Sequence, residues 1–487
     1  MRRVSMCRHA RGRMGIVLTF VVNAGLNFAL GLLIALVLGP EAFGRFSLAL
    51  TVALIINTAL FEWLRLSVTR FYSAHSGTDD PALRATLSLG YAGVSLSLAA
   101  LTVAAFALEL DLGLPTTLLA AAAATGFAYG LFEYQAALAR ARFLDGVYAR
   151  LVVVKNGLAF ALMMASAWIT RDPLWVMAGA ALSASAALLP VWSALRDPAA
   201  RLDLADPQRL KVFAAYGAPI VAANVAFQLT LLATRGATAS AHGFAEAGRL
   251  ALATDVGLRL VATLGAALDV FLFQLAVRVD EREGREAAER QVMRNAVLIF
   301  AALLPLAAGY LVLMPAFEAI LVGEGFRGAY ALYSWILVPG LLAFGLIQYA
   351  LNPLFQLARR TGPALGVALV TLAVTGALLL GLPDRLGPAA LAGAHAAGLV
   401  AAFIVALVLA ARITTARPLL RDLAGIVGAT AVMAVAVWPL RAVGPAWASL
   451  LVGAAAGAGL YGTLILALDV AGLRGLVMAR LRTRKAA

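Results

Sequence analysis

Long apolar runs recur along the whole chain, and they limit its fold more than any other feature. A helix needs about 20 apolar residues to cross the hydrocarbon core of a bilayer. Fourteen runs approach or exceed that length, at residues 14–38, 45–68, 86–108, 115–139, 148–170, 174–195, 212–234, 245–274, 295–316, 330–353, 362–382, 388–411, 422–441 and 446–470. The 487 residues are 62% hydrophobic and 13% charged, with a mean hydropathy of +0.90. This composition excludes a soluble globule, and we expect an all-α polytopic membrane protein with about 14 transmembrane helices.

The positive residues of the connections predict the orientation. With the N-terminal tail in the cytoplasm, 29 of the 39 Lys and Arg residues fall in cytoplasmic tails and connections, and 7 fall in external ones. Lys and Arg collect on the cytoplasmic side of membrane proteins. We therefore expect a multi-pass protein of a bacterial inner membrane with both termini in the cytoplasm.

A tight connection is expected between the first two runs. The stretch Leu38–Ala49 (LGPEAFGRFSLA) is too polar for hydrocarbon, and Gly39, Pro40 and Gly44 supply helix breaks. The sequence therefore predicts a short external turn here.

Part of this turn reappears 204 residues later. Gly44–Ala49 (GRFSLA) corresponds to Gly248–Ala253 (GRLALA), and each copy follows an apolar run with two amides one helical turn apart. These amides are Asn23 and Asn27 in the first run, and Asn224 and Gln228 in the second. We interpret the match as an internal duplication, which is how many transporters are built.

Several classes of function lack their signatures. No G-x-x-x-x-G-K-[ST] motif is present, so the chain has no phosphate loop for nucleotide hydrolysis. The single Cys and four His show no metal-ligand spacing, and the connections are too short for a soluble domain. The net charge of +14 is spread over many connections, which argues against nucleic acid as a partner. We expect no catalytic residues, no metal and no cofactor.

Three segments resemble a known family. The Leu38–Ala49 turn is similar to the LG-x-x-x-[FY]-G turn of the polysaccharide exporters, the Wzx-like flippases of lipid-linked oligosaccharides. Leu60–Tyr72 (LFEWLRLSVTRFY) resembles the end of their second span, and Tyr216–Pro219 (YGAP) resembles the start of their seventh. These exporters share a superfamily with multidrug-and-toxin extruders and lipid II flippases. One departure is Ala233–Arg235, which keeps only the base of an acidic-then-basic pair.

The resemblance implies two six-helix lobes around a central cavity, followed by two further helices. On this pattern the chain divides into a basic tail 1–13, a lobe 14–195, a cytoplasmic linker 196–211, a lobe 212–411, an added helix pair 412–470 and a basic tail 471–487. It also implies flipping of a polyprenyl-diphosphate-linked oligosaccharide by alternating access, in polysaccharide or lipopolysaccharide biosynthesis. Membrane lipids and a polysaccharide polymerase or glycosyltransferase are the partners expected.

Charged residues inside the apolar runs are the first candidates for contact with substrate. Each costs about 2.5–3.5 kcal/mol at the centre of a membrane helix on insertion scales. The candidates are Glu62, Arg65, Glu133, Lys155, Asp255, Arg259 and Asp269. Glu62 and Arg65 are three residues apart and can neutralise each other on one helix, a structural role that we favour for that pair.

Asp255 and Arg259 lie deeper in their run, and there we favour a cavity role. The planar guanidinium of Arg259 suits bidentate contact with a diphosphate.

Two further sets are matched by position. Glu133 and Lys155 fall at one depth on consecutive runs, so we expect them to form a pair. The amides Asn23, Asn27, Asn224 and Gln228 donate and accept hydrogen bonds, which suits sugar hydroxyls and equally suits contacts between helices. Gly453 and Gly457 are interpreted as a close packing site between spans of this same chain.

Two other functions stay open on the sequence. An ion-coupled drug or metabolite antiporter of the same superfamily would use Asp255 or Asp269 as its cation site. A membrane enzyme of glycan assembly is the alternative from another class.

Overall fold

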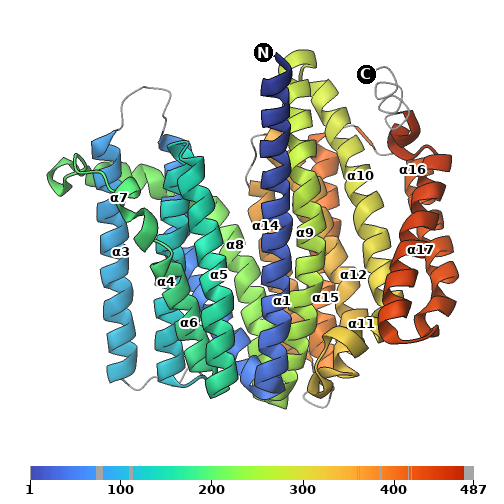
Figure 1. Cartoon of the computed structure of the whole chain (residues 1–487), viewed down its shortest axis with the longest axis horizontal. Helices are drawn as coiled ribbons and strands as arrows, with labels where there is room; N and C mark the ends of the chain where they lie inside the picture. Colours follow the sequence, from blue (N-terminus) through green and yellow to red (C-terminus); the bar gives the residue numbers. More distant parts are fainter. Residues whose placement is uncertain are drawn as a thin grey trace. The chain divides into compact units, whose positions relative to one another are not determined.

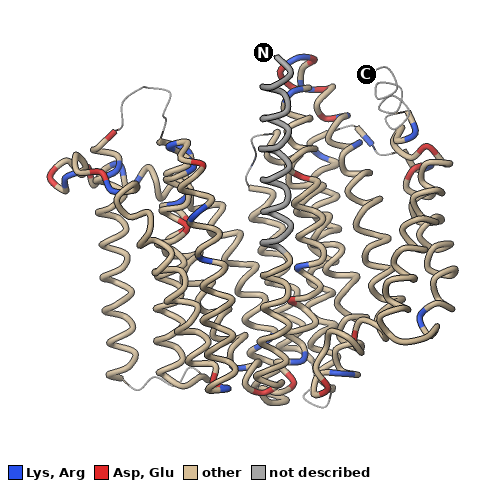
Figure 2. The backbone as a smooth tube through the Cα atoms, viewed as in Figure 1, with Lys and Arg blue, Asp and Glu red and all other residues tan. Residues whose placement is uncertain are grey.

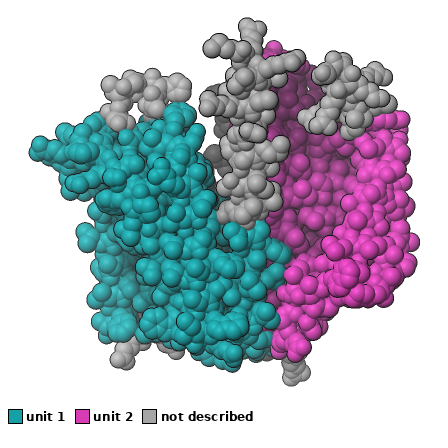
Figure 3. Space-filling view, viewed as in Figure 1, with its two compact units in different colours: residues 1–248 teal, residues 249–487 magenta. Residues whose placement is uncertain are grey.

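The computed structural model describes residues 2–72, 80–108, 113–358, 360, 362–382, 386–414, 416–417 and 419–475, with side chains from residue 25 onward. Regular structure in these ranges is helical throughout, with no strand. The chain forms two compact units, residues 1–248 and 249–487 (Figure 3). The side chains of the basic tail 1–13, and residues 476–487 of the other, lie outside the described part.

Unit 1 contains the elements from α1 to α8 and the first turn of α9 (Figure 1). They are α1 (Arg2–Ile56), η1 (Asn57–Phe61), α2 (Glu62–Phe71), α3 (Pro81–Ala107), α4 (Thr116–Ala141), α5 (Asp145–Thr170), α6 (Pro173–Ala186), η3 (Leu189–Val191), α7 (Trp192–Leu195), η4 (Leu202–Leu204) and α8 (Pro207–His242), where η marks short π or 3-10 segments. Helix α1 packs along α4, α5 and α8, while α2 packs between α4 and α8.

Unit 2 contains most of α9 and everything that follows it. Its elements are α9 (Phe244–Glu283), α10 (Arg285–Val312), α11 (Met314–Leu321), η5 (Glu324–Phe326), α12 (Ala329–Leu346), η6 (Ile347–Leu351), α13 (Asn352–Leu357), α14 (Gly362–Gly381), α15 (Pro388–Ile413), α16 (Leu420–Val437), η7 (Trp438–Ala442), α17 (Ala446–Ala467) and η8 (Val470–Gly472). Helix α15 packs against α12 and α14, and the pair α16–α17 packs on α10 and α11.

Twelve helical segments of the described part are long and apolar enough to cross a membrane. One of them, Gly25–Phe71, covers the first two predicted spans together, because the helix resumes at once after its kink. Helix α4 matches the fourth predicted span but is not among the twelve, since its Thr, Tyr, Glu, Gln and Arg residues lower its mean hydropathy. The count of fourteen spans therefore stays a prediction. In each unit the charged residues gather near the helix ends, with few along their middles (Figure 2).

Three helices of unit 1 begin at an Asp-Pro pair. Asp80, Asp172 and Asp206 cap α3, α6 and α8, each accepting a 2.9 Å hydrogen bond from a backbone N–H of the first turn. The following proline lacks an N–H that would have no partner there, and its fixed φ suits the first helical residue. The sequence thus specifies these three helix starts locally.

The segment predicted as the linker between lobes is joined to α3 by hydrogen bonds and an ion pair. The guanidinium of the buried Arg84 donates to the carbonyl of Leu195, and its Nη1 lies 3.6 Å from Asp197 Oδ2. The N–H of Asp206 donates to Thr86 Oγ1 at 2.9 Å. The two units divide after Gly248 and not in this linker, because α8 packs on α1 and α2. The division into six-helix lobes stays a prediction.

The predicted turn after the first run is a kink of one residue. Gly39 has φ 72° and ψ 173°, and helical structure continues immediately on both sides of it. Positive φ is accessible to glycine without steric cost, and Pro40 suits the first position of the next helical stretch. Gly44 does not break the helix as we expected, since it lies within the resumed helix.

The internal repeat extends further back than the sequence match indicated. Gly243, which ends α8, has φ 85° and ψ 165°, and it lies 204 residues after Gly39, the same offset as Gly248 from Gly44. Both copies therefore consist of a glycine kink followed five residues later by a glycine inside a helix.

The two copies contact each other through bare backbone. A methyl group at Gly44 would overlap the carbonyl oxygen of Phe244 and lie 3.0 Å from the N of Gly248. A methyl group at Gly248 would overlap the Pro40 carbonyl oxygen and lie 2.9 Å from the N of Gly44. Pro40 and Phe244 are again 204 residues apart, so the contact is reciprocal, as in a two-fold related pair.

Unit 2 has its own close contacts. Gly453 and Gly457 of α17 face Val437 and Met433 of α16, so the predicted packing of these glycines within the chain is confirmed. Tyr310 joins α10 to α12 through a 2.6 Å hydrogen bond between its hydroxyl and that of Tyr330.

Replacement of Gly44 by alanine tests the contact between the repeats. Because the added methyl meets backbone atoms, which cannot rotate away, we expect Gly44→Ala to lower the free energy of unfolding by about 3 kcal/mol. Gly236→Ala on α8 is the matched control, since nothing lies within 4 Å of its added methyl. The measurement is unfolding in detergent micelles. Equal stability of the two variants would contradict the contact.

Candidate functional site

A π segment precedes the pair of charges on α2. Residues Asn57–Phe61 form η1, and α2 begins at Glu62 directly after it. π turns within α-helices are found frequently at functional positions. The indole Nε1 of Trp63 donates a 2.8 Å hydrogen bond to the carbonyl oxygen of Leu60, a group that the widened turn leaves available.

Two glycines let α4 approach this segment closely. A methyl group at Gly126 would lie 2.8 Å from the Ala53 carbonyl oxygen, and one at Gly130 would lie 2.6 Å from the ring of Phe61. Small residues four apart allow such close approach between membrane helices. Glu133 follows Gly130 by three residues and therefore faces the first turn of α2.

Arg65 lies between two carboxylates there. It forms an ion pair with Glu62 on its own helix, and its Nε lies 3.4 Å from Glu133 Oε2 on α4. The predicted pair of Glu62 with Arg65 is thus present, but Arg65 also links two helices. Side-chain exposure is 10% for Glu62, 30% for Arg65 and 43% for Glu133, so Glu133 is the most open to a ligand.

An amide from α8 completes the group. The Nδ2 of Asn224 lies 3.2 and 3.1 Å from the two carboxylate oxygens of Glu62 and donates to them. Helix α8 comes close enough because Gly217 faces Trp63, where a methyl group would lie 2.7 Å from its Cβ. We call Glu62, Arg65, Glu133 and Asn224 the polar cluster of unit 1.

Lys155 does not form the ion pair that we predicted with Glu133. Its Nζ lies 5.3 Å from the ring centre of Tyr129 and 6.0 Å from that of Phe132. Glu133 pairs with Arg65 instead. The prediction compared depths along two helices, and depth does not specify toward which neighbour a side chain points. The ammonium is held by the electron-rich faces of two rings.

Gln228 lies one helical turn beyond Asn224 on α8. Its Oε1 is buried, as is Oε1 of Gln135 on α4, and neither accepts a hydrogen bond from the described residues. Buried acceptors are normally satisfied. A ligand hydroxyl or a water molecule can supply the donor.

The remaining predicted residues fall in three places. Asn27 is half-buried on α1, and the side chain of Asn23 lies outside the described part. Asp255, Arg259 and Asp269 are half-buried on α9 in unit 2. The structure therefore brings Arg65, Glu133 and Asn224 together, and their roles with substrate stay predictions.

Three arginines near the predicted external ends of the helices make hydrogen bonds or ion pairs within the protein. Arg235 is buried, and its Nη1 donates to Thr51 Oγ1 at 2.8 Å and to the Ser47 carbonyl at 3.2 Å, which fastens α8 to α1. Arg45 pairs with Glu41 at 3.0 Å. The Nε of Arg249 donates to the Gly325 carbonyl at 3.0 Å. The described ranges contain no group of three or more His, Cys, Asp and Glu side chains placed to hold a metal ion.

Comparison with known proteins gives a fold. No family model and no curated protein matches the sequence. Among solved structures, the lipid II flippase MurJ in an inward closed conformation is similar, with a TM-score of 0.77, 11% identity, and coverage of 95% of this chain and 100% of the flippase.

Two other transporters are also similar. An inward-facing multidrug resistance MATE family transporter of the MOP superfamily matches with a TM-score of 0.61 and 14% identity, over 80% of this chain and 94% of its own. A MOP superfamily transporter from Pyrococcus furiosus, reported to have a binding pocket of reverse polarity, matches with a TM-score of 0.51 and 13% identity, over 82% and 92%. The fold is therefore that of MOP superfamily transporters. With twelve helices in its described part that are long and apolar enough to cross a membrane, the chain is a multi-pass membrane protein.

A double-mutant cycle tests the polar cluster. We expect Arg65→Met to destabilise the protein, because it leaves two carboxylates without their shared partner. Glu133→Gln in the same chain should recover part of the loss, with a coupling of about 1–2 kcal/mol in the free energy of unfolding in mixed micelles.

The cycle of Lys155→Met with Glu133→Gln is the control. It should give a smaller coupling, since Lys155 faces aromatic rings. A larger coupling for Lys155 than for Arg65 would restore the pairing that the sequence predicted.

Proposed function

We propose that this protein flips or exports a polyprenyl-diphosphate-linked oligosaccharide by alternating access. The observation that carries the proposal is the extent of the match to the lipid II flippase. Only 5% of this chain is left unmatched, which is shorter than the helix pair α16–α17, so the match must reach into that pair. The match to the MATE transporter leaves 20% of this chain uncovered, so it accounts for less of the chain than the match to the flippase does.

The polar cluster of unit 1 has the chemistry for a sugar headgroup. Amides and carboxylates can both bind hydroxyls, and the buried Oε1 of Gln228 needs a donor. Glu133 is exposed enough for contact with a ligand. The cluster itself holds two acidic groups and one base, with Lys155 beside it on α5. It therefore suits the glycan better than the diphosphate, for which Arg259 on α9 is the proposed contact.

An ion-coupled antiporter of drugs or metabolites is the second candidate. Glu62 and Glu133 flank one arginine, and carboxylates inside membrane helices are common sites for protons and cations. The similarity to the MATE transporter supports this reading as well. A membrane enzyme of glycan assembly is disfavoured, because the structures to which this chain is similar are transporters.

The proposal includes a cellular setting. The protein would lie in a bacterial inner membrane with both termini in the cytoplasm. Glycosyltransferases would supply the lipid-linked oligosaccharide on that side, and a polysaccharide polymerase would use it on the other.

A deletion strain separates the candidates. We expect lipid-linked oligosaccharide to accumulate in the cytoplasmic leaflet when the gene is removed, with no change in drug susceptibility. Drug susceptibility that rises while the glycan is exported normally would favour the antiporter. Accumulation of translocated but unpolymerised units would favour the enzyme.

The same strain tests Arg259. We expect Arg259→Ala to reach the membrane at normal abundance and fail to restore export. Arg259→Lys should restore part of it, since lysine keeps the charge but not the planar fork. Arg282→Ala is the control, an exposed arginine in the last turn of the same helix. Full export by Arg259→Ala would refute its proposed contact with substrate.

A further inference from the structure

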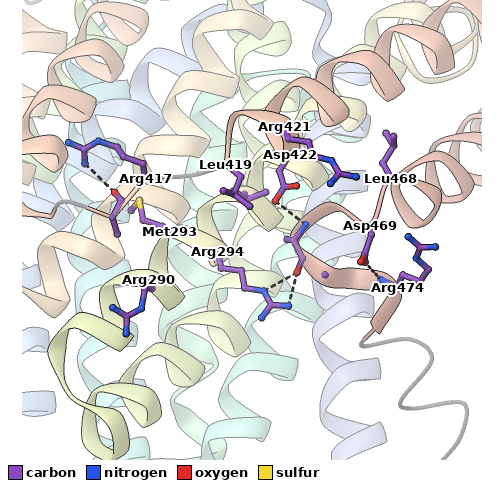
Figure 4. Close-up of a pocket in the computed structure, with 14 residues that line it drawn as sticks. Arg290, Met293, Arg294, Arg417, Leu419, Arg421, Asp422, Leu468, Asp469 and Arg474 are labelled. Atoms are coloured by element: carbon purple, nitrogen blue, oxygen red, sulfur yellow. Dashed lines mark hydrogen bonds between the residues drawn. The ribbon is translucent and has the colours of Figure 1, made fainter.

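A pocket of about 820 Å³ lies at one end of unit 2 (Figure 4). It is enclosed by α10, by the chain leading into α16 and by the chain that follows α17. Five arginines and two aspartates line it, namely Arg290, Arg294, Arg417, Arg421, Arg474, Asp422 and Asp469. In the predicted topology this end of the helices is cytoplasmic.

The two aspartates offset only part of the charge of the five arginines, and both accept hydrogen bonds from the backbone. Asp422 Oδ2 accepts the backbone N–H of Ala471 at 3.2 Å, and Asp469 Oδ1 accepts the backbone N–H of Arg474 at 3.0 Å. Within the described ranges, the guanidinium groups of Arg294, Arg417, Arg421 and Arg474 form no ion pair with a carboxylate. The pocket therefore carries an excess of positive charge.

Two of the arginines are held by carbonyl groups. Arg294 donates from Nε at 2.9 Å and from Nη2 at 2.6 Å to the carbonyl of Ala471. Arg417 Nη1 donates to the Thr414 carbonyl at 2.7 Å. These bonds orient the groups without cancelling their charge.

Arg421 and Arg474 differ from them. Their side chains make no hydrogen bond to the described part of the chain, so within those residues no partner competes with a ligand for their donors.

The backbone beside the pocket adopts an uncommon conformation. Asp469 and Ala471 have φ of 53° and 50°, in the left-handed region that residues with a Cβ rarely occupy. Such conformations persist where surrounding contacts determine them, and they are frequent at binding sites. Here Asp422 and Arg294 both bind Ala471, which holds the segment against the pocket.

An apolar groove continues from the pocket. A second cavity of about 750 Å³ shares Met293, Val297, Ala416 and Arg417 with the first. Its further lining is mostly apolar and comes from α10, α12, α15 and α16, and includes Phe300, Leu346, Phe403, Leu407, Leu423 and Val427. A cationic mouth joined to an apolar groove fits an anion that carries a hydrocarbon chain.

We propose that this pocket binds the phosphate headgroup of an anionic phospholipid, with an acyl chain in the adjoining groove. Basic pockets between membrane helices on the cytoplasmic side bind such headgroups. The positive-inside tendency alone accounts for arginines in these connections. It does not explain why five of them line one cavity, why both aspartates there accept hydrogen bonds from backbone N–H groups, or why an apolar groove adjoins the cavity. The site is separate from the transport proposal and does not depend on it.

The test measures how tightly phosphatidylglycerol binds to the purified protein. Delipidated protein in a neutral detergent is titrated with phosphatidylglycerol or phosphatidylcholine, and bound lipid is counted by native mass spectrometry. Arg421→Gln/Arg474→Gln is the test variant, because neither side chain makes a hydrogen bond or ion pair to the described part of the chain. Arg282→Gln/Arg412→Gln is the control, with the same change of charge at two exposed arginines that do not line the pocket.

We expect wild-type protein and control to prefer phosphatidylglycerol, and the test variant to bind it at least tenfold more weakly. Binding of phosphatidylcholine should be the same in all three. Equal phosphatidylglycerol affinity in the test variant and wild type would overturn the site. Displacement of phosphatidylglycerol by inorganic pyrophosphate would overturn the assignment to a lipid. Displacement by a polyprenyl diphosphate at lower concentration would assign the pocket to a transport substrate instead.

Discussion

The reciprocal contact between Gly44 and Gly248 is the constraint on which the arrangement of unit 1 depends. Each glycine lies inside a helix at a point where any side chain would overlap the backbone of the other copy. Each also follows, by five residues, a glycine with positive φ that changes the direction of the chain. The duplicated segment thus meets its own copy, residues 40–44 against 244–248, through backbone atoms. A side chain at Gly44 or Gly248 would overlap backbone atoms of the other copy. Both copies therefore keep a glycine at this position, five residues after the glycine of the kink.

Similar close approaches build the polar cluster. Gly126 brings α4 to the end of α1, Gly130 brings it to the π segment, and Gly217 brings α8 to Trp63. As a result Glu133 and Asn224 reach the two charges of α2. The cost of placing these charges in the membrane is reduced because each has a partner on a different helix. The cluster therefore binds three helices together, and at Glu133 it remains open enough to contact a ligand.

Much of the helical layout could be predicted from the sequence, because hydrocarbon leaves few options for the backbone. Apolar length located nearly every span, and Asp-Pro pairs marked three helix starts. The partner of Glu133 was predicted wrongly, since depth along a helix says nothing about rotation around it. The GxxxG spacing of Gly126 and Gly130 was a usable signal, as it identifies the face of α4 that packs. The π segment at Asn57–Phe61, whose Phe61 lies against Gly130 of α4, has no comparable signature. The arginine pocket unites residues nearly two hundred positions apart, which a single sequence does not reveal.

The most direct test of the central claim is translocation by the purified protein. Proteoliposomes would carry a fluorescent polyprenyl-diphosphate-linked oligosaccharide in both leaflets, and an external glycosidase would report the fraction that becomes accessible. The account predicts that nearly all of the oligosaccharide is cleaved when wild-type protein is present. Arg259→Ala vesicles should stop near half, the share of the outer leaflet. Cleavage near half with correctly folded wild-type protein would contradict the claim that the chain moves this class of lipid.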